Sequence, residues 1–271
     1  MADRQVMRSV LSALRVMEAV ADHQPAGVGQ LARTLQLPKS TVQRALWSLH
    51  EAGWIRPAPG EVTRWVLTSR VAAMSRHLGE DLGLRGAAMP VMHRLSRETD
   101  ETVHLVAFDG KNAILVERVD TTNPVRVVLP LGTEVPLHGS ANGKAILAAS
   151  RPEDVNHLVH GDLPRLTPTT IVDFEELLAE LDLIRSRGYA TNDGEWRADI
   201  TAAAAAIVAG DSGPVGSMSI SVPRIRTRKS DQDRFGALLR DAAGLVSATI
   251  KPRNSLGPDV GAQRGLFNTA S

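Results

Sequence analysis

The segment VGQLARTLQLPKSTVQRALWSLHE, residues 28–51, decides the fold of the first part of this chain. Two short amphipathic helices are expected in it, joined by a turn that ends at Pro38. We expect Pro38 at the first position of the second helix, where its missing N–H breaks no hydrogen bond. That second helix has apolar side chains at the i, i+3, i+4, i+7 spacing of a buried face, namely Val42, Ala45, Leu46 and Leu49. The segment is therefore predicted to be a helix-turn-helix.

The opposite face of the second helix is polar and has the side chains that a helix in the DNA major groove needs. Glutamine pairs with adenine edges, and arginine pairs with guanine edges or a phosphate. Serine, threonine and the helix N-terminus hold phosphates. The candidate DNA contacts on this helix are Lys39, Ser40, Thr41, Gln43, Arg44 and Trp47. The helix taken alone leaves a second interpretation open, which is an ordinary solvated surface helix.

The residues on either side of this segment complete a larger pattern. A first amphipathic helix is expected at 9–22, with a stripe of Val10, Leu14, Met17 and Ala21. After Gly53, two β-like runs flank the turn residues 57–60 and predict a hairpin over 54–68. Three helices followed by a hairpin is the order of a winged helix-turn-helix, which we assign to residues 6–68. Two arginines beside the hairpin turn, Arg56 and Arg64, are candidates for the DNA backbone or minor groove.

The charge of the chain is divided unevenly along its length. The net formal charge is only +1, but residues 1–76 contain ten Lys and Arg against five Asp and Glu. The remaining residues contain twenty-one against twenty-five. A basic first quarter joined to a mildly acidic remainder is typical of a DNA-binding module attached to another kind of module.

The remainder of the chain mixes helices and strands. We expect a linker and dimerisation helix at 69–84 and a second domain at 85–251, followed by a disordered tail at 252–271. In the second domain, helices are expected at 85–99, 173–187 and 231–250, and a Gly-rich turn with a short helix at 139–150. Strands are expected at Thr102–Phe108, Ala113–Val119, Val125–Leu131, near Tyr189 and at Val215–Val222. This order predicts an α+β fold with a largely antiparallel sheet.

Composition and motif spacing argue against several classes of function. The 271 residues include no cysteine and no apolar run of membrane-spanning length, so we expect a cytoplasmic protein without cofactor or metal. The loop Gly139–Lys144 has one residue too few between its glycines for a phosphate-binding P-loop, and alanine follows its lysine. His138 and Ser140 lack the nucleophile elbow of a hydrolase. We therefore do not expect an enzyme.

Several ordered motifs resemble the IclR family of transcriptional regulators. In the first domain these are residues 30–46 and the continuation Leu49–Ile55. In the second domain they are Glu101–Leu105, Pro136–Ala148, Thr167–Ile171, Arg187–Tyr189 and Ser219–Ser221. The resemblance extends from about residue 6 to 250. The family often has glycine where this chain has Gln36, and usually glycine where it has Asp199.

The resemblance implies a GAF-like effector-binding domain that captures an organic acid or an aromatic metabolite. Ser219 and Ser221 lie at i, i+2 on a predicted strand, so both hydroxyls are expected on one face, able to donate to one carboxylate. The alanines at 202–206 suggest room for a bulky ligand. The positions that match the family's ligand pocket are Val127, Leu129, Val135, Ala141, Asn142, Asn192, Ile200, Ala202, Ser219 and Ser221.

These observations predict a regulator whose operator binding changes when a small molecule binds the second domain. The resemblance implies a homodimer, with pairing into a dimer of dimers. A symmetric dimer expects a pseudo-palindromic double-stranded DNA operator. Two alternatives stay open at this point. One is an architectural DNA binder without a ligand, and the other is an enzyme with a winged-helix appendage.

Overall fold

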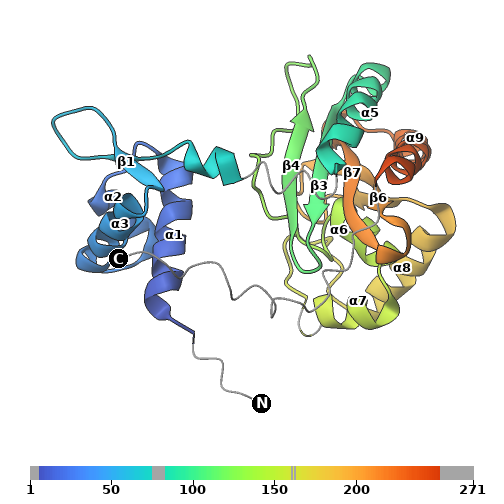
Figure 1. The fold of residues 1–271 in the computed structure, drawn as a ribbon. Helices are drawn as coiled ribbons and strands as arrows, with labels where there is room; N and C mark the ends of the chain where they lie inside the picture. Colours follow the sequence, from blue (N-terminus) through green and yellow to red (C-terminus); the bar gives the residue numbers. More distant parts are fainter. Residues whose placement is uncertain (1–5, 75–82, 160, 162, 251–271) are drawn as a thin grey trace, which may run out of the picture. The chain divides into compact units, whose positions relative to one another are not determined.

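The computed structural model describes residues 6–74, 83–159, 161 and 163–250, and it divides into two compact units (Figure 1). The boundary between the units lies between residues 80 and 81. Each unit has its own hydrophobic core, so each is described by itself.

The first unit contains three helices and a two-stranded antiparallel sheet. The helices are α1 (Arg8–His23), α2 (Val28–Leu35) and α3 (Lys39–Glu51), and the strands are β1 (Ile55–Pro57) and β2 (Trp65–Leu67). The strands pair in the register Ile55 with Leu67, and Ala26 adds one bridge to Trp65. This is the winged helix-turn-helix order expected from the sequence. We call the connection 58–64 between the strands the wing, and it is longer than the predicted turn at 57–60.

The turn between α2 and α3 departs from the expectation in one detail. Pro38 caps α3 from outside instead of occupying its first helical position. Gln36 adopts a left-handed φ of 54°, and its N–H is bonded to carbonyls in the last turn of α2. A non-glycine residue tolerates this conformation only at some cost. The chain therefore keeps the turn geometry without the glycine that the resembling family often has there.

The predicted core stripe of α1 is wrong in its first half. Val10 and Leu14 are 49% and 46% exposed, and the buried residues are Val16, Ala19 and Val20. Met17 is only partly buried, and Ala21 is exposed. Two overlapping apolar stripes with helical spacing exist in this helix, and periodicity alone cannot choose between them. The packing of α2 and α3 decides, because their core side chains cover only the C-terminal half of α1.

Residues 70–74 continue the first unit as a helix. The rest of the predicted linker helix up to residue 82, and the predicted tail at 252–271, lie outside the described residues.

The second unit is built on a five-stranded sheet with the order β4-β3-β7-β6-β5, in which every neighbouring pair is antiparallel. Its strands are β3 (Thr102–Phe108), β4 (Ala113–Val119), β5 (Ala190–Asp193), β6 (Ile200–Val208) and β7 (Pro214–Pro223). The structure therefore confirms the α+β class and the antiparallel sheet.

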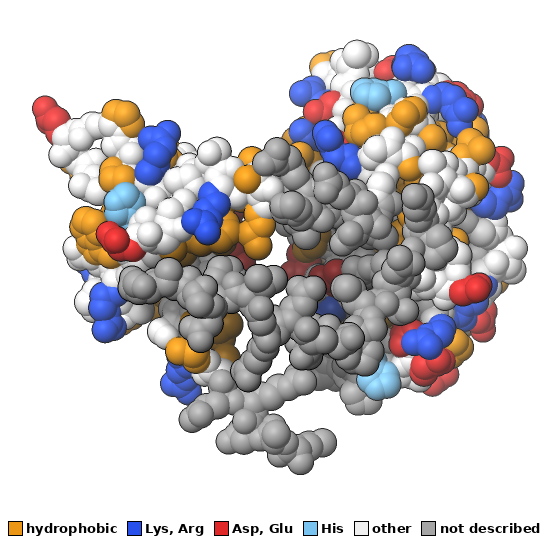
Figure 2. All heavy atoms as spheres, viewed as in Figure 1, with side chains coloured by type: hydrophobic (Ala, Val, Ile, Leu, Met, Phe, Trp, Pro, Cys, Tyr) orange, Lys and Arg blue, Asp and Glu red, His pale blue; other side chains and the backbone are white. Residues whose placement is uncertain are grey.

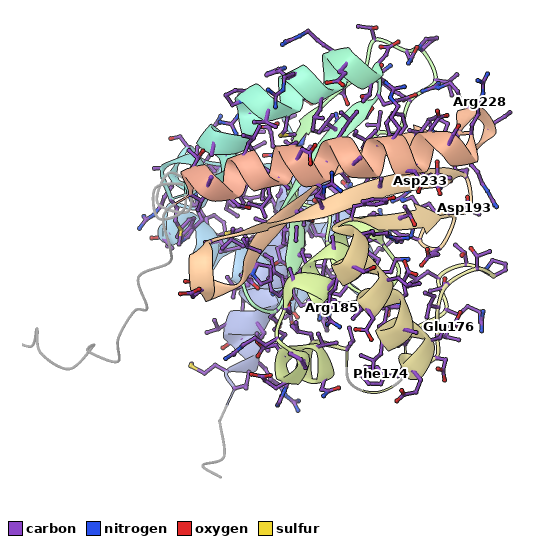
Figure 3. All side chains as sticks on the ribbon, turned by 90° about the vertical axis from the view of Figure 1, so that its right-hand side faces the viewer. Phe174, Glu176, Arg185, Asp193, Arg228 and Asp233 are labelled. Carbon is purple, nitrogen blue, oxygen red and sulfur yellow. The ribbon has the colours of Figure 1, made fainter. Side chains whose placement is uncertain are left out.

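Helices cover both faces of this sheet. On one face lie α5 (Leu84–Thr99) and α9 (Lys229–Thr249), which pack against odd-numbered residues of β3 and β6 and against Val215, Met218, Ile220 and Val222 of β7. On the other side lie α6 (Ala141–Ala149), α7 (Pro152–Leu158) and α8 (Phe174–Arg187). Figure 3 shows α9 and the α8 helix, which bears Phe174 and Arg185, on opposite sides of the strands. Two short 3-10 turns, Gly210–Ser212 and Arg224–Arg226, flank β7.

One strand prediction for this unit is wrong, and one strand was not predicted. Val125–Leu131 is not a strand, although Val127 and Leu129 are buried as its alternation suggests. Its carbonyl groups accept hydrogen bonds from arginine side chains instead of a neighbouring strand: Arg118 donates to Leu129, and Arg226 donates to Val125. The strand β6, in contrast, was not predicted, because five consecutive alanines have a low preference for strands.

Candidate DNA-binding surface and ligand cavity

The candidate DNA-contacting side chains of α3 lie on its outer face. Val42, Ala45, Leu46 and Leu49 are buried, whereas the opposite side chains are exposed and Thr41 is half-buried. Within the residues that the structure describes, Lys39 and Arg44 take part in no ion pair. Figure 2 shows Lys and Arg side chains spread over the visible face of this unit. The outer face of α3 is therefore free to contact an anionic partner.

Trp47 has a structural contact as well as an exposed surface. It is 52% exposed, and its ring meets the buried ring of Trp65 edge-on at 5.7 Å. His50 lies 5.9 Å from Trp47 in a similar edge contact. These contacts hold the outer face of α3 against β2, the second strand of the wing hairpin.

Both arginines beside the wing are exposed and only weakly held. Arg56 donates to the carbonyl of Pro57 and Arg64 to that of Pro25, each at a long 3.4 Å. Their guanidinium groups can therefore move onto a phosphate at little cost.

In the second unit, seven of the ten candidate ligand residues surround one cavity of about 30 Å³. These seven are Leu129, Ala141, Asn142, Asn192, Ile200, Ala202 and Ser221, and Ser140, Trp196 and Arg197 complete the lining. Val127, Val135 and Ser219 are buried beside it. Of the β6 alanines, only Ala202 lines this small cavity, and Trp196 lines it as well. The expectation of a roomy pocket is not met in this conformation.

Two asparagines form the polar floor of the cavity. Asn142 accepts from the Ser217 hydroxyl and donates to Ser219 Oγ, both at 2.9 Å. Asn192 donates to the carbonyl of Gly139 at 2.7 Å. Ser219 and Ser221 share a face as predicted, but Ser219 is bonded to Asn142. Of the two hydroxyls, only that of Ser221 lines the cavity.

The N-terminus of α6 points its first residues at the cavity. Ser140 caps this helix by accepting from the Gly143 N–H at 2.9 Å. The N–H groups of Ala141 and Asn142 belong to the first turn and have no acceptor within the helix. Such an end attracts negative charge. Arg197, an exposed cation whose guanidinium lies 5.2 Å from the ring of Trp196, adds a second positive group.

Sequence reasoning missed a buried ion pair between Lys144 and Glu195, the residue before the cavity-lining Trp196. Lys144, in the first turn of α6, is only 2% exposed, and its Nζ lies 2.7 and 2.8 Å from the two carboxylate oxygens of Glu195. Burial raises the pKa of Glu195, and Lys144 opposes that shift. The only indication of this ion pair in the sequence is one lysine within a predicted helix that is otherwise largely apolar.

A buried histidine beside the cavity was also missed as a site residue. His104, on β3, is 1% exposed, and its Nδ1 lies 3.1 Å from Ser221 Oγ. Burial, with the nearby charge of Arg118, lowers the pKa of His104 to about 4. The imidazole is therefore neutral at neutral pH.

A larger hollow of about 280 Å³ lies elsewhere in this unit, between α6, α8 and β6. Four of its eight lining residues are alanines, and Arg185 (labelled in Figure 3) is already bonded to the Ala148 carbonyl and to Asp182. It therefore offers few groups that would orient a ligand.

In the described part of the chain, no cluster of three or more His, Asp or Glu side chains is placed to hold a metal ion. No helix among the described residues is long and apolar enough to span a membrane.

Comparison with known proteins identifies both units. Residues 9–59 match the IclR helix-turn-helix domain, and residues 77–248 match the bacterial transcriptional regulator IclR C-terminal domain. The chain is 29% identical over 240 residues to the HTH-type transcriptional regulator KdgR of Dickeya chrysanthemi, covering 88% of this chain and 78% of KdgR. It is 32% identical over 229 residues to the repressor AllR of Salmonella paratyphi A, covering 83% of each chain.

Solved structures of IclR-type regulators have the same fold as this chain. An IclR-type regulator from Silicibacter sp. TM1040 superposes with a TM-score of 0.74 at 26% identity, over 90% of this chain and 96% of that one. An IclR homologue from Microbacterium hydrocarbonoxydans, solved with 4-hydroxybenzoate, gives a TM-score of 0.73 at 23% identity, over 89% and 98% of the two chains. With both domains matched in order and across most of its length, this chain belongs to the IclR family of DNA-binding transcriptional regulators.

Proposed function

We propose that this protein binds a specific operator through α3 and that a small carboxylate in the second unit modulates this binding. The proposal of DNA binding rests on the outer face of α3, where Gln43 and Arg44 are exposed on a helix whose other face is buried. These two side chains are suited to base edges, and Lys39, Ser40 and Thr41 at the helix start are suited to phosphates.

Gel-shift titration with fragments of the genome tests this half. The expected result is tight binding to a few fragments, with affinity that falls as salt rises. Gln43→Ala and Arg44→Ala should each weaken operator binding by about 1–3 kcal/mol. Glu18→Ala, on a helix that presents no predicted DNA contact, is the control and should leave affinity unchanged. Equal affinity for every fragment would exclude a sequence-specific regulator and favour an architectural DNA binder.

Three positive groups converge on the cavity and support a carboxylate as the effector class. They are the first-turn N–H groups of α6, the Ser221 hydroxyl and the Arg197 guanidinium. The cavity volume of about 30 Å³ is roughly that of one water molecule. A ligand the size of 4-hydroxybenzoate, which binds the Microbacterium homologue, would therefore need Trp196 to move.

Acetate and 4-hydroxybenzoate are probes for this half because they bracket the size range. A ligand at 100 times its Kd should stabilise the protein by about 2.7 kcal/mol, which a thermal-shift assay detects. Binding of acetate alone would indicate that the site accepts only a small acid. If neither acetate nor 4-hydroxybenzoate binds while the protein still binds its operator, the proposed carboxylate effector is contradicted and the proposed DNA binding is not.

The exposed apolar side chains at the start of the first unit support a homodimer. They lie in and just before the first half of α1, where Val6, Met7, Val10, Leu11 and Leu14 are each 46–67% exposed. Apolar side chains so grouped usually mark an interaction surface. We assign this stripe to a second copy of the chain, which would place two α3 helices on a pseudo-palindromic operator.

Analytical ultracentrifugation of Leu14→Glu tests the assignment. The variant should shift toward monomer and lose affinity for the full operator more than for a half-site. Leu183→Glu, an exposed leucine of α8, is the control. A Leu14→Glu protein that remains dimeric would place the interface elsewhere, and a tetrameric wild-type protein would add the expected dimer of dimers.

A further inference from the structure

Two polar atoms on the cavity side of β3 are buried without a hydrogen-bond partner in the described part of the chain. They are Thr102 Oγ1 and His104 Nε2. The two residues alternate along the strand and so share the face that meets Ser219 and Ser221 of β7. A buried polar atom without a partner destabilises the fold, because it has lost its hydrogen bonds to water and gained none in the protein. The fold keeps these two unpaired atoms beside the cavity, so we expect a functional reason for their position.

The reason lies in the contact between His104 and Ser221. His104 Nδ1 is 3.1 Å from Ser221 Oγ, and this is the one hydrogen bond of the Ser221 side chain among the described residues. A neutral imidazole has one N–H and one lone pair, so the contact can run in either direction. If Nδ1 accepts, the Ser221 proton is used inside the protein. If Nδ1 donates, that proton is free for the cavity, which Ser221 lines.

The unpartnered Nε2 decides between the two directions. When Nδ1 accepts, Nε2 has the hydrogen and becomes a buried N–H without an acceptor. When Nδ1 donates, Nε2 has only an unused lone pair. Buried donors without partners are rarer in proteins than under-used acceptors. The environment also disfavours a second proton. Burial lowers the pKa of the His104 ring, and the charge of Arg118, opposite His104 in the sheet, lowers it further against a weaker opposing effect of Asp120.

We propose that His104 is a specificity-determining residue whose Nδ1–H donates to Ser221 Oγ and so directs the Ser221 hydroxyl hydrogen into the cavity. His104 does not touch the ligand itself; it sets Ser221 as a donor. The cavity then selects a carboxylate or carbonyl oxygen and disfavours a ligand that presents a donor at this point. This inference rests on the effector site proposed above and adds the polarity of one wall.

Nitrogen-15 NMR of the full-length protein with labelled histidine tests the tautomer without any ligand. At neutral pH the expected spectrum has His104 protonated at Nδ1 and bare at Nε2. His104→Asn identifies the signal by its absence; should that variant fail to fold, Ser221→Ala identifies it by a shift. A hydrogen on Nε2, or on both nitrogens, would overturn the proposal.

Acetate then tests the direction of the Ser221 hydroxyl. Adding acetate should shift the His104 Nδ1 signal in the wild-type protein and leave it unmoved in Ser221→Ala. Acetate affinity should fall about tenfold in Ser221→Ala, as expected for the loss of one hydrogen bond to a charged group. If the His104 Nδ1 signal of the wild-type protein does not shift when acetate is added, the Ser221 hydroxyl hydrogen does not point into the cavity and the proposal is refuted. Operator binding is measured in a separate assay. Its absence would contradict the proposed function and would leave the assigned tautomer of His104 unaffected.

Discussion

Replacing Lys144 by methionine should destabilise the second unit strongly at alkaline pH. The lysine is 2% exposed and its Nζ contacts both oxygens of Glu195, which is itself 13% exposed. Methionine fills a similar volume, so the cavity left behind is small. Removing one partner of a buried pair costs about 3–5 kcal/mol, because the other charge is left buried and unpaired. We expect a loss in that range for Lys144→Met at pH 8.

The same argument predicts how the loss changes with pH. Burial already raises the pKa of Glu195, and the lysine counteracts this. Without Lys144 the folded-state pKa rises further above its unfolded value, so the ionised carboxyl destabilises the fold at high pH and the penalty diminishes as pH falls and the group protonates. The loss at pH 5 should therefore be smaller than at pH 8. Adding Glu195→Gln to Lys144→Met should restore most of the stability.

Urea unfolding followed by circular dichroism measures these losses, and amide hydrogen exchange over residues 190–208 reports on the second unit. Arg151→Met, which breaks the exposed pair with Asp154, is the control and should change little. The reasoning fails if Lys144→Met loses less than about 1 kcal/mol at pH 8. It also fails if the double variant is as unstable as the single one.

Three further outcomes are expected. Gly143→Ala should cost at least about 3 kcal/mol, because its Cβ would lie 2.4 Å from backbone atoms of Pro136 and Leu137; in a thermal melt Gly244→Ala, with no atom within 4 Å, should not destabilise. The pKa of His104 is lowered to about 4 in the folded protein. Its contribution to the free energy of unfolding is therefore complete above its unfolded pKa and is lost as pH falls, by about 2 kcal/mol between pH 7 and 5. Urea titrations of His104→Asn at several pH values should lack this part of the pH dependence. Trp47→Ala should reduce both operator affinity and the melting temperature of the first unit, since its ring packs on Trp65; an effect on affinity alone would mean that the packing contributes nothing.

The local pattern of the sequence determined the helix-turn-helix and the edges of several elements. In α3, four apolar residues at helical spacing identify the buried face, and the exposed face follows from it. Strands β3 and β4 begin and end where alternation and turn residues place them. These features depend on neighbours within a few residues, so a single sequence contains the information.

Tertiary contacts decided the rest. The buried half of α1 depends on how far the core of α2 and α3 extends, and β6 is a strand because β5 and β7 bond to both of its edges. Residues 125–131 lose their strand because arginines far along the chain bind their carbonyls. Near the cavity, His104 contacts Ser221, 117 residues away in the chain, and Lys144 contacts Glu195, 51 residues away. Such pairs form only when the chain is folded, because nothing in the local pattern of either residue specifies its partner.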